Sequence, residues 1–319
     1  MKTALVLGGG GFIGSHLVKR LKTEGYWVRA VDLKYPDFSN SVADEFVIGD
    51  LRNPEVVKQN IDKPFDEIYQ LAADMGGAGY IFTGDHDADV MHNSALINLN
   101  VAHYATLVGT KKLFYSSSAC MYPQGMQRED GMGDLREEDA YPANPDSEYG
   151  WEKIFSERLY ESFRRNYGLN IRIGRFHNIF GPEGTYKGGK EKAPAAICRK
   201  IAEADNTIEV WGDGRQTRSF LYIDECVEGV RRLMESDCCV PVNIGSDERV
   251  SINQLVEMVC SISGKQHIFV KHIEGPQGVR SRNSNNEFIK MTLGWAPSVS
   301  LKDGLIKTYQ WISEQVKAL

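Results

Sequence analysis

Short apolar runs alternate with longer amphipathic segments through the first half of the chain. The runs are rich in β-branched and aromatic residues, as buried parallel strands are, while the segments between them repeat apolar residues at helical spacing. The expected strands are residues 3–7, 27–32, 45–48, 67–71, 113–116 and 170–174, and the expected helices are residues 12–24, 54–61, 90–108 and 148–167. Strands and helices in alternation predict βαβ units and an α/β fold with a doubly wound parallel sheet.

The pattern changes after residue 175. Residues 176–218 are rich in glycine, proline and basic side chains around one helical stretch, 194–204, and a helix at 223–234 and a strand at 242–244 then return to the sheet. Helical patterns follow at 252–263 and 301–316. We therefore expect a larger domain of residues 1–175 and 219–245, with a smaller C-terminal domain of residues 176–218 and 246–319 interleaved with it in sequence.

Composition places the chain among water-soluble globular proteins. Of its 319 residues, 42% are apolar and 25% are charged, and a chain of this length buries a large core without covalent staples. The formal net charge of −6 argues against a nucleic acid as partner. No signal-like segment precedes the first apolar run, and no run approaches the ~18 residues of a membrane span. We expect a cytoplasmic protein with no membrane partner.

The cysteines show no paired spacing. They are Cys120, Cys198, Cys226, Cys238, Cys239 and Cys260. The absence of Cys-x-x-Cys pairs argues against both a disulfide framework and a structural zinc site, so reduced thiols are expected.

A glycine-rich turn follows the first expected strand. Gly8, Gly11 and Gly14 stand at three-residue spacing in GGGGFIGS, immediately before a helix. Glycines here permit a tight turn and close approach of the backbone to a pyrophosphate, while the free amides of the helix N-terminus face the anion. With Phe12 and Ile13, these residues form the expected dinucleotide-binding turn of a Rossmann fold.

Two acidic residues follow the next strands. Asp32 ends the second strand, where a carboxylate accepts hydrogen bonds from a ribose diol and repels a 2′-phosphate, so NAD is the expected cofactor. Asp50 follows the third strand, where it could meet the adenine. The alternative for each residue is a simple turn in which the carboxylate caps backbone amides.

Tyr149 and Lys153 form the candidate proton-transfer pair. They stand four residues apart in a helical stretch, so the phenol and the ammonium share one face. The pKa of a free phenol is near 10, and an adjacent ammonium with an oxidised nicotinamide lowers that pKa and gives a usable base. Tyr186 and Lys190 repeat the spacing, but the two glycines between them argue against a helix. Ser118 ends a strand where it could share a substrate oxygen with Tyr149; its alternative is a polar strand end.

Longer strings carry a family resemblance. The glycine turn, Leu71-Ala-Ala73, Ser118, and Tyr149 with Lys153 resemble the extended short-chain dehydrogenase/reductase family and its nucleotide-sugar-modifying members. The strings that resemble the GDP-mannose 3,5-epimerases of that family span nearly the whole chain: LAADMGG (71–77), SSACMYP (117–123), GRFHNIFGP (174–182), KGGKEKAPAA (187–196), WGDGRQTRSF (211–220), IDECVEGV (223–230), VNIGSDE (242–248) and residues 280–283. Residues 84–89 depart from the family pattern as a slightly longer loop on the substrate side.

The resemblance implies an isomerase that inverts C3 and C5 of GDP-D-mannose, giving GDP-L-galactose or GDP-L-gulose through a transient 4-keto sugar with tightly bound NAD. Tyr149 would take the proton of the 4-hydroxyl, and Cys120 and Lys192 would be the acid and base on opposite faces of the sugar. From the residues alone, Cys120 fits a small packing residue equally well and Lys192 fits a solvated loop charge.

The resemblance also assigns the domains and the assembly. The larger domain would bind NAD, with Leu71 and Ala73 lining the cofactor, and the smaller domain would bind the nucleotide sugar. Two helices of each subunit, expected at residues 92–108 and 148–167, would pair in a homodimer.

A basic region lies in the expected substrate domain. From residue 175 to 218, eight basic side chains stand against six acidic ones, in a chain that is acidic overall. A planar guanidinium pairs with phosphate through two hydrogen bonds. The family's substrate-contacting positions correspond here to Gly76, Ser118, Cys120, Asn178, Glu191, Lys192, Ala193, Lys200, Gln216, Arg218 and Arg282. A surface polar group is the alternative for each of those not already discussed.

Several other functions stay open. A 3,5-epimerase of another GDP-linked sugar, such as a heptose, a simple 4-epimerase and a non-catalytic NAD-dependent sensor are the alternatives. Dehydration is disfavoured because Ala119 and Cys120 stand where the family's sugar dehydratases carry an acidic pair. The acidic segment 85–89 could hold a divalent ion, but carboxylates at the positive start of a helix are the favoured interpretation, and no metal site is expected.

Overall fold

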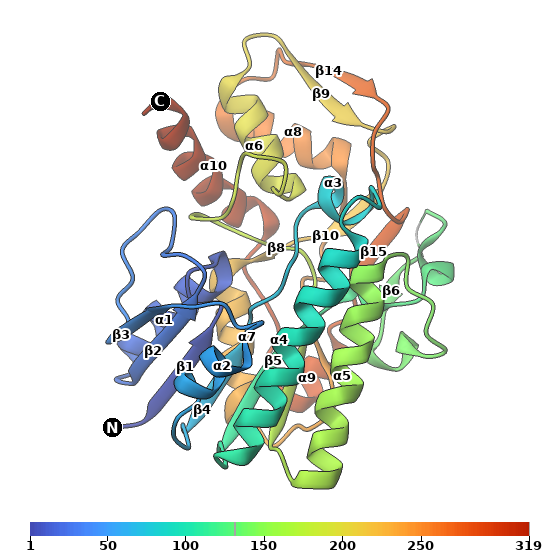
Figure 1. The fold of residues 1–319 in the computed structure, drawn as a ribbon. Coiled ribbons are helices and arrows are strands. Elements are labelled where there is room, and N and C mark those ends of the chain that lie inside the picture. The colour runs from blue at the N-terminus through green and yellow to red at the C-terminus, as the bar shows by residue number, and fades with distance from the viewer. Residues whose placement is uncertain (131, 319) are drawn as a thin grey trace.

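A parallel seven-stranded sheet forms the centre of the computed structural model, which describes residues 1–130 and 132–318 (Figure 1). The strand order is β12-β7-β5-β4-β1-β2-β3. These strands are β1 (Thr3–Leu7), β2 (Trp27–Asp32), β3 (Glu45–Ile48), β4 (Glu67–Gln70), β5 (Lys112–Ser118), β7 (Ile171–Phe176) and β12 (Val242–Ile244). The predicted doubly wound sheet is confirmed. Because the winding reverses beside β1, a crevice opens at the carboxyl ends of β1 and β4, where such folds bind ligands.

Two helical layers cover the sheet because its strand residues alternate between the faces. Ala4 and Val6 of β1 pack in one apolar cluster with α1 (Phe12–Thr23) and α7 (Ile223–Glu235). Leu5 and Leu7 pack on the opposite face with residues of α2 (Pro54–Asn60), α4 (Asp87–Leu107) and α5 (Glu148–Tyr167). Burial on both faces explains why the strands read as continuous apolar runs.

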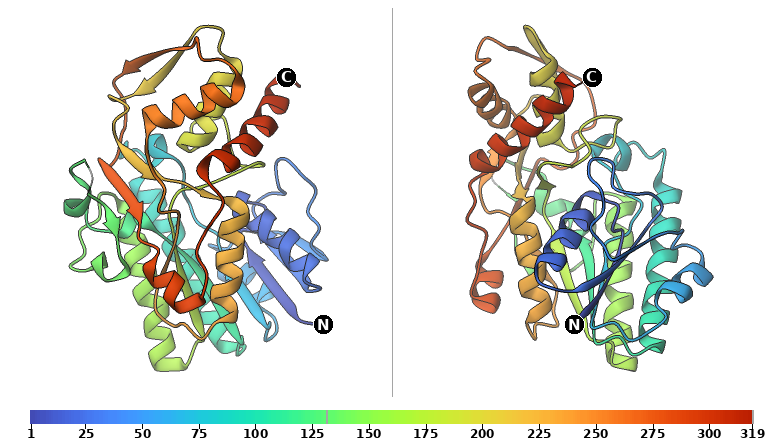
Figure 2. Two further views of the ribbon diagram at one scale, coloured as in Figure 1. Left: turned by 180° about the vertical axis from the view of Figure 1, so that it is seen from behind. Right: turned by 90° about the vertical axis from the view of Figure 1, so that its left-hand side faces the viewer.

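A second group of elements stands over the carboxyl ends of the strands (Figures 1 and 2). In it α6 (Ala193–Glu203), α8 (Ile252–Ser263) and α10 (Leu301–Lys317) pack on one another beside the parallel pair β9 (Thr207–Trp211) and β14 (Phe269–Ile273). A mixed sheet of order β13-β10-β15-β6 lies alongside. Its strands are β13 (Arg249–Ser251), β10 (Thr217–Ser219), β15 (Ser281–Ser284) and β6 (Asp134–Leu135).

The remaining elements are short. We call the elements above the carboxyl ends of the strands the upper lobe. The chain enters it after β8 (Ile179–Phe180) and leaves it before β11 (Leu221–Tyr222), and these two strands pair with each other. The short helix α3 (Ala78–Ile81) precedes α4. After β15 the chain descends to α9 (Glu287–Leu293), which packs beside β12, and then climbs back to α10 (Figure 2). No described helix has both the length and the apolar character that crossing a bilayer requires.

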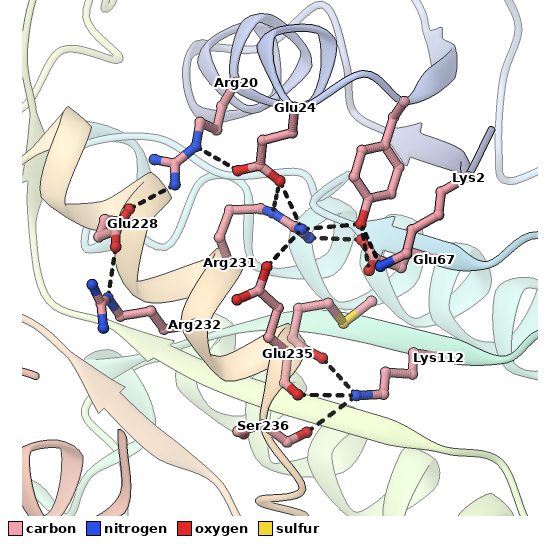
Figure 3. Close-up of polar contacts among 12 residues, drawn as sticks. Lys2, Arg20, Glu24, Glu67, Lys112, Glu228, Arg231, Arg232, Glu235 and Ser236 are labelled. Atoms are coloured by element: carbon pink, nitrogen blue, oxygen red, sulfur yellow. Dashed lines mark hydrogen bonds and ion pairs between the residues drawn. The ribbon is translucent and has the colours of Figure 1, made fainter. Parts of the chain in front are cut away.

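A buried charge network ties α7 to the end of α1 and to the amino end of the central strand β4 (Figure 3). The guanidinium of Arg231 lies 2.6 Å from Glu67 and 2.8 Å from Glu24, and it also contacts the hydroxyls of Tyr26 and Tyr69. Arg231 is only 2% exposed. A charge buried this deeply is tolerated only while its partners remain in place, so the network holds α7 and the end of α1 against β4.

Candidate active site

The glycine turn has the shape of a phosphate cradle. Gly8 adopts φ +87°, and a Cβ at Gly8 would lie 2.8 Å from the amide nitrogen of Ala72. A Cβ at Gly14 would lie 2.0 Å from the carbonyl oxygen of Gly8. No side chain caps α1 at Gly11, so the amides of its first turn, which includes Phe12 and Ile13, are available to an anion. The residues therefore fit the pyrophosphate of a dinucleotide.

The two acidic residues behind this turn differ. Asp32 accepts a 2.9 Å hydrogen bond from the amide of Gly10, and burial raises the pKa of its carboxyl. This places a carboxylate at the cradle, as the ribose interaction requires. Asp50 instead binds Arg52, with nitrogen–oxygen distances of 2.6 and 2.9 Å. The side chain that was expected to meet adenine is thus held by a neighbouring guanidinium.

Strand β5 and helix α5 bring the proton-transfer residues together. Ser118 ends β5, and its hydroxyl accepts a 3.2 Å hydrogen bond from the amide of Cys120 while also contacting the phenol of Tyr149. The Nζ atom of Lys153 lies 5.3 Å from the centroid of the Tyr149 ring and donates to the carbonyl of Ser116 at 3.1 Å. α5 begins at Glu148, so the expected shared face of a helix is present.

Burial controls the ionisation of this pair. It raises the pKa of the Tyr149 phenol, and the nearby Cys120 and Glu152 act in the same direction. It lowers the pKa of Lys153, against the attraction of Glu152, whose carboxylate lies 3.8 Å from the ammonium. The pKa of Tyr149 therefore departs in the direction opposite to the one expected from an ammonium neighbour alone. A further positive charge is needed to make the phenolate accessible.

Cys120 lies in a buried polar cluster that the sequence did not indicate. Nη1 of Arg282 donates to the sulfur of Cys120 at 3.0 Å, and Nε of Arg282 donates to Gln127 at 2.6 Å. Nη2 of Arg282 lies 3.5 Å from the carboxylate of Asp146. Arg282 is 4% exposed. The sequence around Asp146 and Gln127 gives no sign that they belong to the site, because both contact it through Arg282, which is distant along the chain.

Two arginines lie side by side on neighbouring strands. Arg218 of β10 pairs in register with Arg282 of β15, and burial, followed by the charge of Arg282, lowers the pKa of Arg218. The Arg218 guanidinium donates to the backbone carbonyls of Thr217, Gln277 and Val279. Arg218 is thus next to the guanidinium that bonds the Cys120 sulfur, so the two arginines and the thiol form one cluster.

Lys192 approaches this cluster from the upper lobe. It is the N-cap residue of α6, directly before Ala193, and burial lowers the pKa of its ammonium. Cys120 and Cys226 are near enough to favour the charged form. The structure therefore brings Lys192 into electrostatic contact with Cys120, although the two residues lie in separate lobes.

Most of the other expected substrate residues form hydrogen bonds or ion pairs within the chain. Asn178, at φ +45°, donates to the carbonyl of Ser219, and Lys200 donates to the carbonyl of Glu209. Glu191 accepts from the amide of Gly189 and lies 3.5 Å from Arg199. Oε1 of Gln216 is buried without a hydrogen-bond partner in the described structure. Gly76, the remaining expected position, stands just before α3.

The acidic loop has no metal-site geometry. No group of three or more His, Cys, Asp or Glu side chains within residues 1–130 and 132–318 could hold a metal ion. Asp87 and Asp89 instead lie in the first turn of α4, and the ring of His86 stacks on Tyr80.

Comparison with known proteins agrees with this geometry. The model of the NAD dependent epimerase/dehydratase family matches residues 4–245. GDP-mannose 3,5-epimerase of Arabidopsis thaliana is 49% identical over 314 residues, which cover 98% of this chain and 82% of that protein.

Two solved structures share the whole fold. UDP-glucose 4-epimerase of Thermotoga maritima, solved with UDP-glucose, is 26% identical with a TM-score of 0.87, and the match covers 98% of this chain and 99% of that one. UDP-glucuronic acid 4-epimerase of Bacillus cereus, solved with UDP-glucuronic acid and NAD, is 26% identical with a TM-score of 0.84 and the same coverage. The expected epimerase class and NAD cofactor are confirmed at the level of the family. The chain belongs to the NAD dependent epimerase/dehydratase family and, within it, to the GDP-mannose 3,5-epimerases.

Proposed function

We propose that this protein inverts C3 and C5 of GDP-D-mannose through a transient 4-keto sugar, giving GDP-L-galactose. Inversion of C5 alone would give GDP-L-gulose. The observation that supports the proposal is that Cys120 lies beside Tyr149 and Ser118, while Lys192 caps α6 close enough for Cys120 to affect its pKa. We assign Cys120 and Lys192 as the two proton carriers. A simple 4-epimerase needs only Tyr149 and Ser118. The high identity to a GDP-mannose 3,5-epimerase supports the choice of sugar nucleotide.

The first step is oxidation at C4. NAD, when bound, accepts the hydride from C4. Tyr149 takes the proton of the 4-hydroxyl, Ser118 holds the same oxygen by a hydrogen bond, and the buried ammonium of Lys153 stabilises the phenolate. Since the protein alone raises the pKa of Tyr149, use of the phenol as a base would depend on a further positive charge, which an oxidised nicotinamide would supply.

The second step is inversion. The carbonyl at C4 acidifies the C–H bonds at C3 and C5, so a base removes each proton and an acid delivers a proton to the opposite face. Cys120 and Lys192 reach the pocket from different lobes, which suits groups acting from two faces of one ring. Arg282, bonded to the Cys120 sulfur, orients the thiol. Return of the hydride to C4 then ends the cycle.

Binding of the substrate divides between the lobes in this proposal. Residues 1–175 and 219–245 hold NAD, with Gly8, Asp32, Leu71 and Ala73 at the cofactor. Residues 176–218 and 246–319 bind the nucleotide sugar, where Arg218 has the charge and position to pair with an anionic oxygen. Lys200 and Gln216 are further candidates for the nucleotide.

Product analysis tests the proposed substrate. Incubation with GDP-D-mannose, followed by separation and NMR of the products, is expected to give GDP-L-galactose. Formation of the C4 epimer alone would favour a 4-epimerase, and conversion of a GDP-heptose without conversion of GDP-D-mannose would favour the other sugar.

We also propose a homodimer in the cytoplasm. Leu99 and Leu107 of α4, and Trp151 and Phe155 of α5, expose large apolar side chains on adjacent helices at the outer face of the sheet (Figure 1). An exposed apolar surface of this kind favours a partner, and the same two helices pair in the family that the sequence resembles.

A further inference from the structure

Residues 77–90, which run through α3 into the first turn of α4, contact both the residues around Tyr149 and the loop before α6. Ile81 and Val90 pack in one apolar cluster with Tyr149, and Tyr80, Phe82 and Cys120 border that cluster. This segment therefore contacts the side of the pocket that carries the phenol and the thiol. It includes the loop at 84–89 that departs from the family pattern.

The same segment contacts the loop that leads to Lys192. The amide of Gly77 donates to the carbonyl of Lys190 at 3.1 Å, and a Cβ at Gly77 would lie 2.3 Å from the carbonyl oxygen of Glu191. The backbones thus touch directly, one or two residues before Lys192. Gly77 permits this approach because it has no side chain.

The Tyr80 ring is the side-chain part of this junction. The Nζ atom of Lys190 lies 3.8 Å from the ring centroid, the imidazole of His86 stacks on the ring at 4.1 Å, and the hydroxyl donates to Asp74 at 2.9 Å. Asp74 is held in turn by Asn93 of α4 at 2.9 Å. The ring is therefore fixed to the main sheet domain on one side and to the Lys192 loop on the other.

The ring contact matters more than the accompanying ion pair. Lys190 also lies 3.8 Å from the Asp74 carboxylate, but the lysine side chain is 50% exposed. Ion pairs this exposed contribute little, whereas a cation over an aromatic face within about 6 Å of its centroid is attracted by the ring itself. A tyrosine or a phenylalanine at position 80 would both provide that face.

We propose that Tyr80 is a positioning residue for Lys192, setting the distance between Lys192 and the Cys120–Tyr149 side of the pocket. The inference rests on the proposed function of Lys192 as one of the two proton carriers. Tyr80 touches neither sugar nor cofactor in this role. It acts by holding Lys190, and through it the loop on which Lys192 stands.

The variants Tyr80→Leu, Tyr80→Phe and Lys190→Met test this role. Two steps are measured with GDP-D-mannose: exchange of C3 and C5 protons with solvent deuterium, which needs Lys192, and formation of the 4-keto sugar, which needs Tyr149. The keto sugar is captured by a borodeuteride quench and appears as deuterium at C4. Tyr167→Leu is the matched control, because Tyr167 packs on Phe163 far from the pocket and is exposed.

Tyr80→Leu is expected to slow exchange at C3 and C5 by about tenfold or more, since small displacements of a reacting group cost rates of that order, while keto-sugar formation changes much less. Lys190→Met should show a smaller loss in the same step. Tyr80→Phe keeps the ring face for Lys190 but loses the hydrogen bond to Asp74, so it should lose clearly less than Tyr80→Leu. The Tyr167→Leu control should stay within about twofold of the wild type on the same reasoning.

The positioning role of Tyr80 would be overturned if Tyr80→Leu lost both steps equally or lost neither. It would also be overturned if Tyr80→Phe lost as much as Tyr80→Leu. If Tyr80→Leu fails to fold, Lys190→Met decides, and unchanged exchange in that variant contradicts the proposal. Failure of the proposed function has a different signature, because the wild-type protein itself would then show no exchange.

Discussion

At the scale of single residues, the site depends on burial. Tyr149 and Lys153 are 7% and 2% exposed, and burial pushes both groups towards their neutral forms. A buried neutral phenol is a poor base until a positive charge arrives beside it. Burial in the protein alone therefore favours the protonated form of Tyr149, so the proposed role of Tyr149 as a base would need an additional positive charge beside it.

Two variants separate the residues that perform the two chemical steps. Tyr149→Phe removes the base for the 4-hydroxyl, so all turnover should fall by about 10²–10⁴-fold, the usual range for loss of a general acid–base group. Cys120→Ala should retain formation of the 4-keto sugar, captured by borodeuteride, while inversion is lost. If Cys120→Ala loses both steps equally, the thiol is not the proton carrier that we assign.

At the scale of elements, most of the frame could be predicted from the sequence. The strands 3–7, 27–32, 45–48 and 242–244 and the helices 148–167 and 252–263 have their predicted bounds. Buried parallel strands and amphipathic helices carry strong periodic signals. The other predicted elements end within three residues of their expected bounds.

The parts of the site that were not predicted lack such a signal. β10 and β15 have three and four residues, too few to show a period, yet they place Arg218 beside Arg282. α3 has four residues and carries Tyr80. The hydrogen bond of Arg282 to Gln127 crosses 155 residues, and the ion pair of Arg282 with Asp146 also joins distant parts of the chain. Such contacts exist only once the chain is folded.

The network at Arg231 gives a stability prediction for the packing of α7. Arg231→Met would leave Glu67 buried without its cation, and removal of one partner of a buried pair costs about 3–5 kcal/mol of unfolding free energy. Arg232→Met is the matched control, because Arg232 pairs with Glu228 at the surface and such pairs contribute about 1 kcal/mol or less (Figure 3). Urea unfolding of both variants measures the difference. Similar losses in the two variants would show that Arg231 does not hold α7 against the sheet.

At the scale of the whole molecule, the proposed proton carriers come from two lobes. Ser118 ends β5, Cys120 lies in the turn that follows it and Tyr149 lies in α5, while Lys192 caps α6 in the upper lobe. The pocket thus depends on how the lobes meet, and the segment 77–90 is in contact with both. The distance between Cys120 and Lys192 therefore depends on how the two lobes pack against each other.

The exposed helices α4 and α5 give a prediction about assembly. Leu99→Glu should dissociate the proposed dimer, because a charge replaces an apolar side chain on the helix face that we assign to the contact, and sedimentation velocity would then show a monomer. Met291→Glu on α9, where Met291 is also exposed, should leave the dimer intact. A wild-type protein that sediments as a monomer, or a Leu99→Glu variant that stays dimeric, would contradict the proposed interface.

The central claim is that one pocket inverts two carbons of one sugar. The most direct measurement is incubation of the wild-type protein with GDP-D-mannose in deuterium oxide, with NMR or mass spectrometry locating the deuterium. Since each inversion replaces a carbon-bound proton by one derived from solvent, deuterium is predicted at both C3 and C5 and not at C4, whose hydrogen travels to the cofactor and back. Absence of deuterium at both C3 and C5 would contradict the account.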